Sequence, residues 1–560
     1  MLKKIMLFFI AFGLSLNWLA AAGAQDSGVD ILDRERARTQ PAPLSQPMFR
    51  IEEDRQPSPA DASIVFTLKS LRVDGATVFT QDQLLSPYKR LYQSQISFET
   101  LNALAAELTK KYRDSGYLLS KVVLPAQEVD QYGAEIRLFA IEGFISSVEY
   151  QGEPGLITRF KKRFSSVERK LLSKKPLKHK DFEREMLLLQ DLPGIEVSSR
   201  FQDGAVQSGS ILVLEIKSQP VSGSLGWGNS GTDSAGPGII TASLSLDSLP
   251  LIGMKTTLSY TQADNFKEYH SITLAESYRF PNGLLLSASF ASGRSPEPDT
   301  DFARLYDYKT KSNTFNFRVS YPFIRSRDLN LSLEVGYEHR DSSAELLGEH
   351  YNRDRLRNLH ISSNFDFSDE YGGVTQFITT FTHGLKAFNA TNHDSESSNT
   401  LAMANYYKID FYLSRNQQLP YNFSFLVAAE AMKSDRLLYS YNKFSFGGGQ
   451  FGRGYQSGAL EGDNAVAVSF EPRWTYHFGE TVAFQPFAFI DYGRVWTNYE
   501  VYGVPDSQYG SSVGAGFRLW GHLGSEKLPD FNLSAYWGQQ LKRLDDKDPY
   551  RFIFQASFYF

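Results

Sequence analysis

The protein has no cysteine among its 560 residues, so neither a disulfide nor a cysteine-ligated metal site can form. Its net charge of −5 is too small to indicate a nucleic-acid partner. After the first residues, the sequence has no apolar run of about 18 residues, the length that a transmembrane helix needs. These absences exclude a disulfide framework, nucleic-acid binding through bulk charge, and insertion into a membrane through helices.

Motifs for catalysis and for cofactors are also missing. The nine histidines are scattered and form no H-E-x-x-H pair, so we expect no metal site. The glycine-rich stretch Phe446–Tyr455 lacks the lysine and the strand-to-helix context of a phosphate-binding loop. No serine stands in a convincing nucleophile elbow. The sequence therefore predicts a protein with no enzymatic activity, no metal and no cofactor.

Aromatic residues and glycine are abundant, while the mean hydropathy is only −0.33. The chain contains 42 phenylalanines, 30 tyrosines and 42 glycines. Weak hydropathy with many aromatic residues is typical of a membrane β-barrel, because lipid-facing and lumen-facing side chains alternate along each strand.

The first 24 residues are predicted to be a secretory signal peptide. Lys3 and Lys4 precede an apolar core that begins at Ile5. This core is short, and Ala22-Gly23-Ala24 behind it forms a small-residue cleavage site, which favours a signal peptide over a membrane anchor. A cysteine-free exported chain suits an oxidising compartment.

Residues 25–63 combine a possible short helix with a proline-rich stretch. Ile31 and Leu32 lie beside a charged run that ends at Arg38, and five prolines follow before residue 60. Prolines interrupt helices and favour extended chain. Two interpretations stay open, a solvated linker and a plug helix held on a tether.

Two small α/β domains are predicted next, at residues 64–143 and 144–219. In the first, apolar residues from Leu101 to Tyr112 recur at helical spacing, and Gly116 is a helix C-terminal cap. In the second, two helical patterns follow a strand, and Pro193-Gly194 ends the second helix. Each domain also has flanking strands, so the two form an internal repeat of pattern.

A basic tract lies within the second domain, between Arg159 and Lys180. Its residues include Lys161, Lys162, Arg163, Arg169, Lys170, Lys174, Lys175 and Lys178. A solvated helix face is the simplest interpretation. Attraction of an acidic client or of anionic lipid headgroups is the functional alternative.

From residue 220 to residue 560, strand-length segments alternate between apolar and polar residues and are separated by turn residues. The segment 329–338 shows the pattern, with apolar residues at Leu329, Leu331, Leu333, Val335 and Tyr337. A closed barrel in lipid pairs every backbone group and leaves no strand edge. We therefore expect a transmembrane β-barrel of roughly 16 antiparallel strands.

One loop and one late strand carry the candidate functional residues. Arg453 stands among glycines that let the backbone turn tightly, and it precedes Gly454 and Tyr455. Asp491 lies in a predicted strand with Phe487, Phe489 and Gly493. Because a guanidinium fits a carboxylate in bidentate fashion, we expect Arg453 to meet Asp491 inside the barrel. A purely structural lock is the alternative to a role in transport.

The two α/β domains resemble the POTRA (polypeptide-transport-associated) domains of two-partner secretion transporters. The resemblance lies in Gly116-Tyr117, in Leu124-Pro125-Ala126-Gln127 and in Ile141-Glu142-Gly143 for the first domain. Asp191-Leu192-Pro193-Gly194 resembles a turn in the second. The resemblance implies that these domains lie in the periplasm and hold an unfolded client, for which pairing at an exposed sheet edge would be the physical basis.

The barrel carries three further resemblances to this family. Arg453-Gly454-Tyr455 is similar to the motif at the tip of the sixth extracellular loop, although Gly452 stands where a valine is commonest. Phe487, Phe489, Asp491 and Gly493 are similar to the matching strand motif. The final strand, with Phe558 and Phe560, resembles the signal that the barrel-assembly machinery reads.

The family resemblance implies a bacterial outer-membrane pore that passes one unfolded partner protein from the periplasm to the cell surface. The implied partners are a secreted exoprotein of the adhesin or cytolysin type, outer-membrane lipid and the barrel-assembly machinery, with no nucleic acid. A barrel-assembly factor of the same superfamily is the alternative. A passive porin is less suited, because it has no use for two periplasmic domains.

Overall fold

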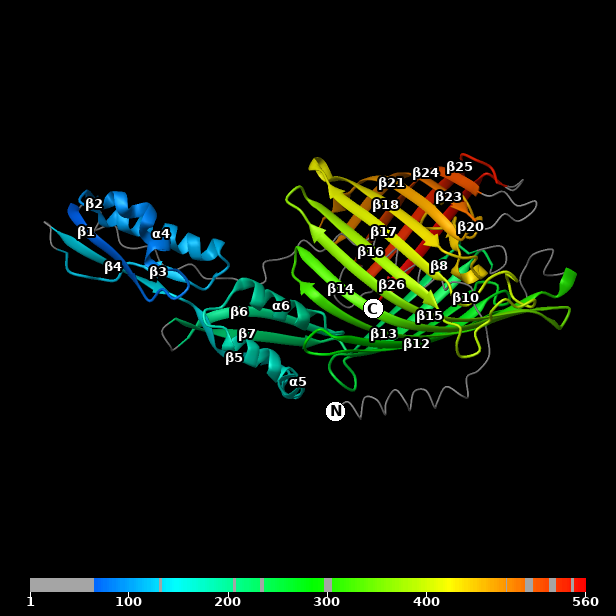
Figure 1. Cartoon of the computed structure of the whole chain (residues 1–560), viewed down its shortest axis with the longest axis horizontal. Helices are drawn as coiled ribbons and strands as arrows, with labels where there is room; N and C mark the ends of the chain where they lie inside the picture. The colour runs from blue at the N-terminus through cyan, green and yellow to red at the C-terminus, as the bar shows by residue number, and fades with distance from the viewer. Residues whose placement is uncertain are drawn as a thin grey trace. The chain divides into compact units, whose positions relative to one another are not determined.

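The computed structural model describes residues 65–129, 133–204, 208–231, 236–296, 305–479, 481–498, 507–522, 530–544 and 548–560. The described chain separates into two compact units, one ending at Gln219 and one beginning at Pro220 (Figure 1). The predicted signal peptide and the predicted plug helix with its linker lie outside the described residues. No helix in the described ranges is long and apolar enough to cross a membrane.

The first α/β fold packs a long helix against a four-stranded sheet of order β2-β1-β4-β3, in which β1 and β4 run parallel. Its elements are β1 (Val65–Asp74), α3 (Gln81–Leu85), η3 (Ser86–Leu91), β2 (Gln95–Ser97), α4 (Phe98–Asp114), β3 (Lys121–Val123) and β4 (Ala134–Ile141). Ser97 caps α4, and the apolar stripe predicted from Leu101 to Tyr112 is buried. The helix α3 and the strand β2 were not predicted, because both are too short to show a period.

The second α/β fold has a three-stranded sheet of order β5-β7-β6, with β5 and β7 parallel. Its elements are β5 (Phe144–Gly152), α5 (Pro154–Ser173), α6 (His179–Gln190), β6 (Ile195–Asp203) and β7 (Gly209–Ser218). Both helices bury the apolar faces that their spacing predicts, including Phe160 and Phe164 on α5 and Met186 on α6. The order of strand, two helices and two strands agrees with the sequence-based expectation.

Glu142 connects the end of β4 to the chain that follows β1. Its Oε1 accepts hydrogen bonds from the backbone nitrogens of Thr77 at 2.8 Å and Val78 at 2.9 Å. The hydroxyl of Tyr112 donates to the same oxygen at 2.8 Å, and the Thr77 hydroxyl donates to Oε2. Partial burial raises the pKa of the Glu142 carboxyl, but these hydrogen bonds outweigh it, so that its pKa lies below the usual range.

The second unit is a closed antiparallel barrel (Figure 1). Its strand segments are β8 (Val221–Gly228), β9 (Ile239–Asp247), β10 (Met254–Ala263), β11 (His270–Arg279), β12 (Leu285–Ser295), β13 (Lys309–Arg325), β14 (Leu329–Leu346), β15 (Glu349–Ser368), β16 (Gly373–Gly384), β17 (Tyr407–Gln418), β18 (Phe423–Ser434), β21 (Asn464–Trp474), β22 (Tyr476–Phe478), β23 (Val482–Trp496), β24 (Ser507–His522), β25 (Asp530–Gln540) and β26 (Tyr550–Tyr559). Both β21 and β22 pair with β23 as one interrupted strand, so the described barrel has the 16 strands expected.

The barrel closes where its last strand meets its first. Phe558 of β26 lies opposite Leu225 of β8, and the backbone groups of Phe560 and Gly223 exchange hydrogen bonds at 2.8 and 3.0 Å. Along β14, Leu333 and Val335 are exposed, whereas Glu338 and Arg340 farther along the strand are buried. The even positions of this strand therefore face the lumen, as the alternation predicts.

The position of Glu142 generates a prediction for the stability of the first α/β fold. Replacing Glu142 with Gln removes a charged acceptor of several hydrogen bonds and should destabilise this fold by about 1–3 kcal/mol. Because the pKa of Glu142 is lowered in the folded state, its contribution is present above pH 4.5 and is lost as the pH falls below that value. Amide hydrogen exchange of α4 and β4 in the full chain measures this loss.

Glu135→Gln is the matched control. Glu135 lies on β4, which Glu142 directly follows, and its side chain forms an exposed pair with Lys69, at 3.0 Å; such pairs contribute little. Equal exchange protection in the two variants at neutral pH would contradict the assigned role of Glu142.

Candidate functional site

The candidate site begins with the long loop between β18 and β21. Two short strands, β19 (Phe444–Phe446) and β20 (Leu460–Gly462), form a hairpin within this loop. At the start of the tip, Gly447 has a φ of +115°, and a Cβ placed there would lie 1.9 Å from the carbonyl oxygen of Gln456. Only glycine permits this close return of the chain, which turns the tip back toward the barrel wall.

Arg453 at the loop tip forms a bidentate ion pair with Asp491 on β23. Its Nε donates to Oδ2 of Asp491 at 3.0 Å, and its Nη2 donates to Oδ1 at 2.8 Å. The backbone nitrogen of Arg453 also donates to Oδ2, at 3.0 Å. Arg453 is 6% exposed and Asp491 is fully buried. The pairing expected from the sequence is therefore present, with backbone and side chain held by one carboxylate.

A second carboxylate, Glu471 on β21, also binds Arg453. Its Oε2 accepts from Nη1 of Arg453, while Ser469 on the same strand accepts from Nη2 at 2.9 Å. The other oxygen, Oε1, accepts from Arg473 at 2.6 Å and from Arg518 of β24 at 2.8 Å. Glu471 thus links three arginines and is only 2% exposed.

The five ionisable groups do not balance, because three arginines meet two carboxylates. Burial of a charge costs several kcal/mol unless good geometry and further hydrogen bonds compensate for it. Two aromatic rings supply part of this compensation. The guanidinium of Arg453 lies 3.7 Å from the ring centroid of Phe489, and that of Arg518 lies 4.0 Å from Phe487. Such cation–π contacts are favourable when the cation is desolvated.

One glycine of the loop tip and one of the wall make room for the contact between loop and wall. A Cβ on Gly454 would lie 2.8 Å from the carbonyl carbon of Gln539. A Cβ on Gly493 would lie 2.3 Å from the ring of Phe446, which reaches from the loop toward β23. These two predicted residues therefore act through the absence of a side chain, which lets loop and wall come into contact.

Tyr455 fixes the tip to β24 and to the chain that follows β25. Its hydroxyl donates to the carbonyl oxygen of Lys542 at 2.6 Å and lies 2.9 Å from that of Ser511. The backbone nitrogen of Ser511 donates back to the hydroxyl at 3.0 Å. The ring packs against Phe446 at a centroid distance of 5.7 Å. The tip thus contacts β21, β23 and the chain at the ends of β24 and β25.

The residues that start the loop are held at a different place. The hydroxyl of Tyr439, a fully buried residue, donates to the carbonyl oxygen of Thr391 at 2.7 Å. Tyr441 donates to Glu338 of β14 at 3.3 Å, and its ring centroid lies 3.5 Å from the guanidinium of Arg340. The loop is therefore fixed at its start by β14 and the β16–β17 loop, and at its tip by β21 to β25.

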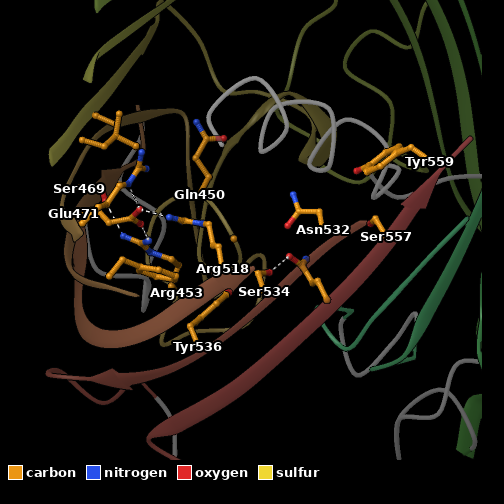
Figure 2. A pocket seen from close by; sticks show the side chains of 16 residues that line it. Gln450, Arg453, Ser469, Glu471, Arg518, Asn532, Ser534, Tyr536, Ser557 and Tyr559 are labelled. Atoms are coloured by element: carbon orange, nitrogen blue, oxygen red, sulfur yellow. Dashed lines mark hydrogen bonds and ion pairs between the residues drawn. The ribbon is translucent and has the colours of Figure 1, made fainter. Parts of the chain in front are cut away.

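An open pocket lies beside the ion cluster. Figure 2 shows Arg453, Glu471 and Arg518 on one side of it, and Asn532, Ser534, Ser557 and Tyr559 on the strands across from them. Exposed Val466, Val468 and Phe470 alternate with buried Ser469 and Glu471 on β21, so the cluster faces the lumen. The pocket lining offers neutral hydroxyl and amide groups next to a surplus of positive charge.

The predicted site residues fall into two groups. The loop and the wall bring the first group together, namely Arg453, Gly454, Tyr455, Asp491, Phe487, Phe489 and Gly493. Phe558 lies on the last strand and Phe560 directly follows it, and they are 38% and 62% exposed. Within the described ranges, no group of three or more metal-ligating side chains is close enough to hold an ion.

Three charged residues of the network were missed by sequence reasoning, namely Glu471, Arg473 and Arg518. For Glu471 and Arg473 the signal was the alternation on β21, where they occupy the face opposite the apolar Val466, Val468 and Phe470. Charged residues that alternate with exposed apolar ones are expected in the lumen. The alternation alone does not say which of them meet across strands.

Comparison with known proteins places the chain among secretion proteins. The family model of the haemolysin secretion/activation proteins ShlB, FhaC and HecB matches residues 208–517, and that of the ShlB-type POTRA domain matches residues 66–143. The heme/hemopexin transporter protein HuxB of Haemophilus influenzae is 24% identical over 529 residues, which cover 89% of each chain. The outer membrane transporter CdiB of Escherichia coli is 23% identical over 420 residues, which cover 73% of this chain and 69% of CdiB.

Solved structures share the fold. CdiB from Escherichia coli superposes with a TM-score of 0.72 at 20% identity, covering 97% of this chain and 100% of that chain. BamA from Haemophilus ducreyi, lacking POTRA domains 1–3, superposes with a TM-score of 0.51 at 14% identity, covering 89% of this chain and 100% of that chain.

The central position of Glu471 generates a prediction. Glu471→Gln leaves three neighbouring arginines with Asp491 as their remaining carboxylate, so the loop tip should lose about 3–5 kcal/mol of stabilisation. Amide hydrogen exchange of residues 444–462 in the membrane-inserted protein should increase. A second change, Arg518→Gln, lowers the charge surplus and should partly restore protection, which makes the two effects non-additive.

Glu349→Gln, at an exposed position on β15, is the matched control. Exchange equal to the wild type in Glu471→Gln would show that Glu471 does not hold the tip. Strictly additive effects of Glu471→Gln and Arg518→Gln would show that these two side chains are not coupled.

Proposed function

Because the chain belongs to the haemolysin secretion/activation family of two-partner secretion transporters, whose model matches residues 208–517 of 560, we propose that it serves one exported partner protein. It is an outer-membrane transporter, and its POTRA units lie on the periplasmic side. The partner binds these units and passes unfolded through the barrel to the cell surface. The observation that supports this proposal most directly is the loop between β18 and β21, which the ion pair of Arg453 and Asp491 holds in the lumen. We call this ion pair the loop lock.

The lock would act by holding the loop tip in one place while the client passes. The tip is fixed by side chains from β21 and β23 and by backbone groups of β24, whose spacing the barrel wall determines. A client that moves through the lumen meets the polar lining of the pocket beside Arg453 and Arg518. We assign Arg453 and Asp491 the role of keeping the loop out of this path and in its folded form.

The client is proposed to be a large exoprotein of the adhesin or cytolysin type. Of the two curated relatives named above, HuxB is called a heme/hemopexin transporter, whereas the name of CdiB, an outer membrane transporter, states no cargo. A heme- or hemopexin-binding exoprotein is therefore the second class of client to be tested.

The last strand is proposed as the element that the barrel-assembly machinery recognises. Phe558 of β26 and Phe560 directly after it are exposed, and the backbone of Phe560 completes the seam with Gly223. Exposure to lipid and position at the seam are what a terminal recognition strand needs. No feature of the pore in the described residues favours an assembly factor or a passive porin over a transporter.

Deletion of the protein in its native host gives the first test. One large protein should disappear from the culture supernatant and the cell surface, because a dedicated transporter has one client. Mass spectrometry of these fractions identifies the client and its class. A parallel loss of many outer-membrane barrels would instead indicate an assembly factor, and an unchanged secretome would contradict dedicated transport.

Substitution of the ion pair tests the lock. Arg453→Ala and Asp491→Ala should each abolish client secretion while the barrel remains inserted, because removing one partner of a buried pair costs about 3–5 kcal/mol. The double variant should be little worse than either single variant, since both act on one interaction. Secretion is measured as the amount of client in the supernatant. Insertion of the barrel is measured by its heat-modifiable migration in gel electrophoresis.

Arg353→Ala provides the control, because Arg353 is an exposed arginine of β15 that lies 3.7 Å from Asp341. Normal secretion by Arg453→Ala would remove the loop lock from the mechanism, even if the deletion confirmed a dedicated client.

A further inference from the structure

The helix α5 of the second α/β fold carries a strongly cationic surface. We define the basic face as the exposed lysines and arginines of α5 and of the chain that follows it, namely Arg159, Lys161, Lys162, Arg169, Lys170, Lys174, Lys175, Lys178 and Lys180. From Arg159 to Lys180 the sequence contains one acidic residue, Glu168, whose carboxylate accepts from Tyr150 at 2.9 Å. The basic face is therefore almost free of negative charge.

The apolar side of α5 is already used. Leu156, Phe160, Phe164, Val167 and Leu171 are buried in the core of the fold. The helix is therefore amphipathic: its apolar face packs against the core of the fold, and its opposite face carries the charges. Because the apolar side is occupied, the basic face can interact with a partner only through charge and hydrogen bonds.

Internal contacts neutralise only part of the basic face. Lys170 pairs with Glu185 at 3.0 Å, and Lys174 pairs with Asp181 at 3.4 Å. Both lysine side chains remain 49% exposed. Lys161 and Lys175 lie over aromatic rings, which bear no net charge. A surplus of positive charge is therefore left on the surface.

The start of α5 lies at the end of the fold from which the chain enters the barrel. In the parallel pair β5·β7, Gly152 lies opposite Ile216, so both strands finish at the same end of the sheet. The helix begins directly after β5, and Leu156 lines one small cavity together with Ser218. Only Gln219 and Pro220 separate β7 from β8. The start of α5 therefore lies at the end of the fold where β7 finishes and from which the chain continues into a membrane strand.

We propose that the basic face binds the headgroups of anionic phospholipids in the periplasmic leaflet of the outer membrane. Clusters of four to eight lysines and arginines next to a membrane segment are attracted to anionic lipid. Most of its cations are lysines, which bind phosphate as point charges without the fixed fork of arginine. The basic face therefore recognises negative charge rather than one headgroup, and the contact is weakened by salt.

The absence of cysteine makes a direct measurement possible. Ser165, exposed in the middle of α5, is replaced by cysteine in the full chain and labelled with a donor fluorophore. The protein is placed in nanodiscs of phosphatidylcholine alone or with phosphatidylglycerol, each containing a headgroup-labelled acceptor lipid. Energy transfer should be higher with phosphatidylglycerol, and raising the salt from about 0.05 M to about 0.5 M should remove the difference.

Charge-removing variants identify the surface. Replacing Arg159, Lys162 and Arg169 with glutamine should reduce the phosphatidylglycerol-dependent increase by at least about threefold. The matched control replaces the same number of exposed cations in the first α/β fold, with Arg90→Gln, Lys110→Gln and Arg113→Gln, and should retain the increase.

Energy transfer that is the same with and without phosphatidylglycerol would overturn the proposal and indicate a solvated face. Loss of client binding by the basic-face variant, without any dependence on lipid, would also overturn it and identify an acidic client as the partner. This proposal does not rest on the loop lock, so normal or abolished secretion by Arg453→Ala leaves it unaffected.

Discussion

The buried guanidinium of Arg453 is the constraint on which the rest of the site depends. A cation taken out of water needs carboxylates, hydrogen-bond acceptors and aromatic faces at fixed positions. The barrel supplies them from β21 and β23, because adjacent strands place side chains of one face in register. Asp491 lies opposite Ser469 on one side and Ser512 on the other, so one row across three strands surrounds the loop tip. The loop is thus positioned by the geometry of the wall.

The same constraint explains which residues the sequence revealed. Arg453 and Asp491 were predicted, because an arginine among glycines and a lone carboxylate in an aromatic strand are unusual in sequence. Glu471 was missed, because it lies in an ordinary alternating strand, and its contact with Arg518 depends on a register that no local pattern encodes. The barrel and the two α/β folds were predictable from the spacing of apolar residues and from the turn residues between segments. The side chains that meet across neighbouring strands could be identified only from the structure.

The loop is held in two chemically different ways, and this difference has a mechanical consequence. At its start the donors named here are uncharged, since the hydroxyl of Tyr439 donates to a carbonyl oxygen and the backbone nitrogen of Leu438 donates to Oδ1 of Asp463 at 2.8 Å. Its tip is fixed by ion pairs around Arg453. Loss of the ion pairs therefore frees the tip while the start stays attached, and the loop would move about its base rather than leave the lumen. A variant at Arg453 consequently tests the position of the tip and not the presence of the loop.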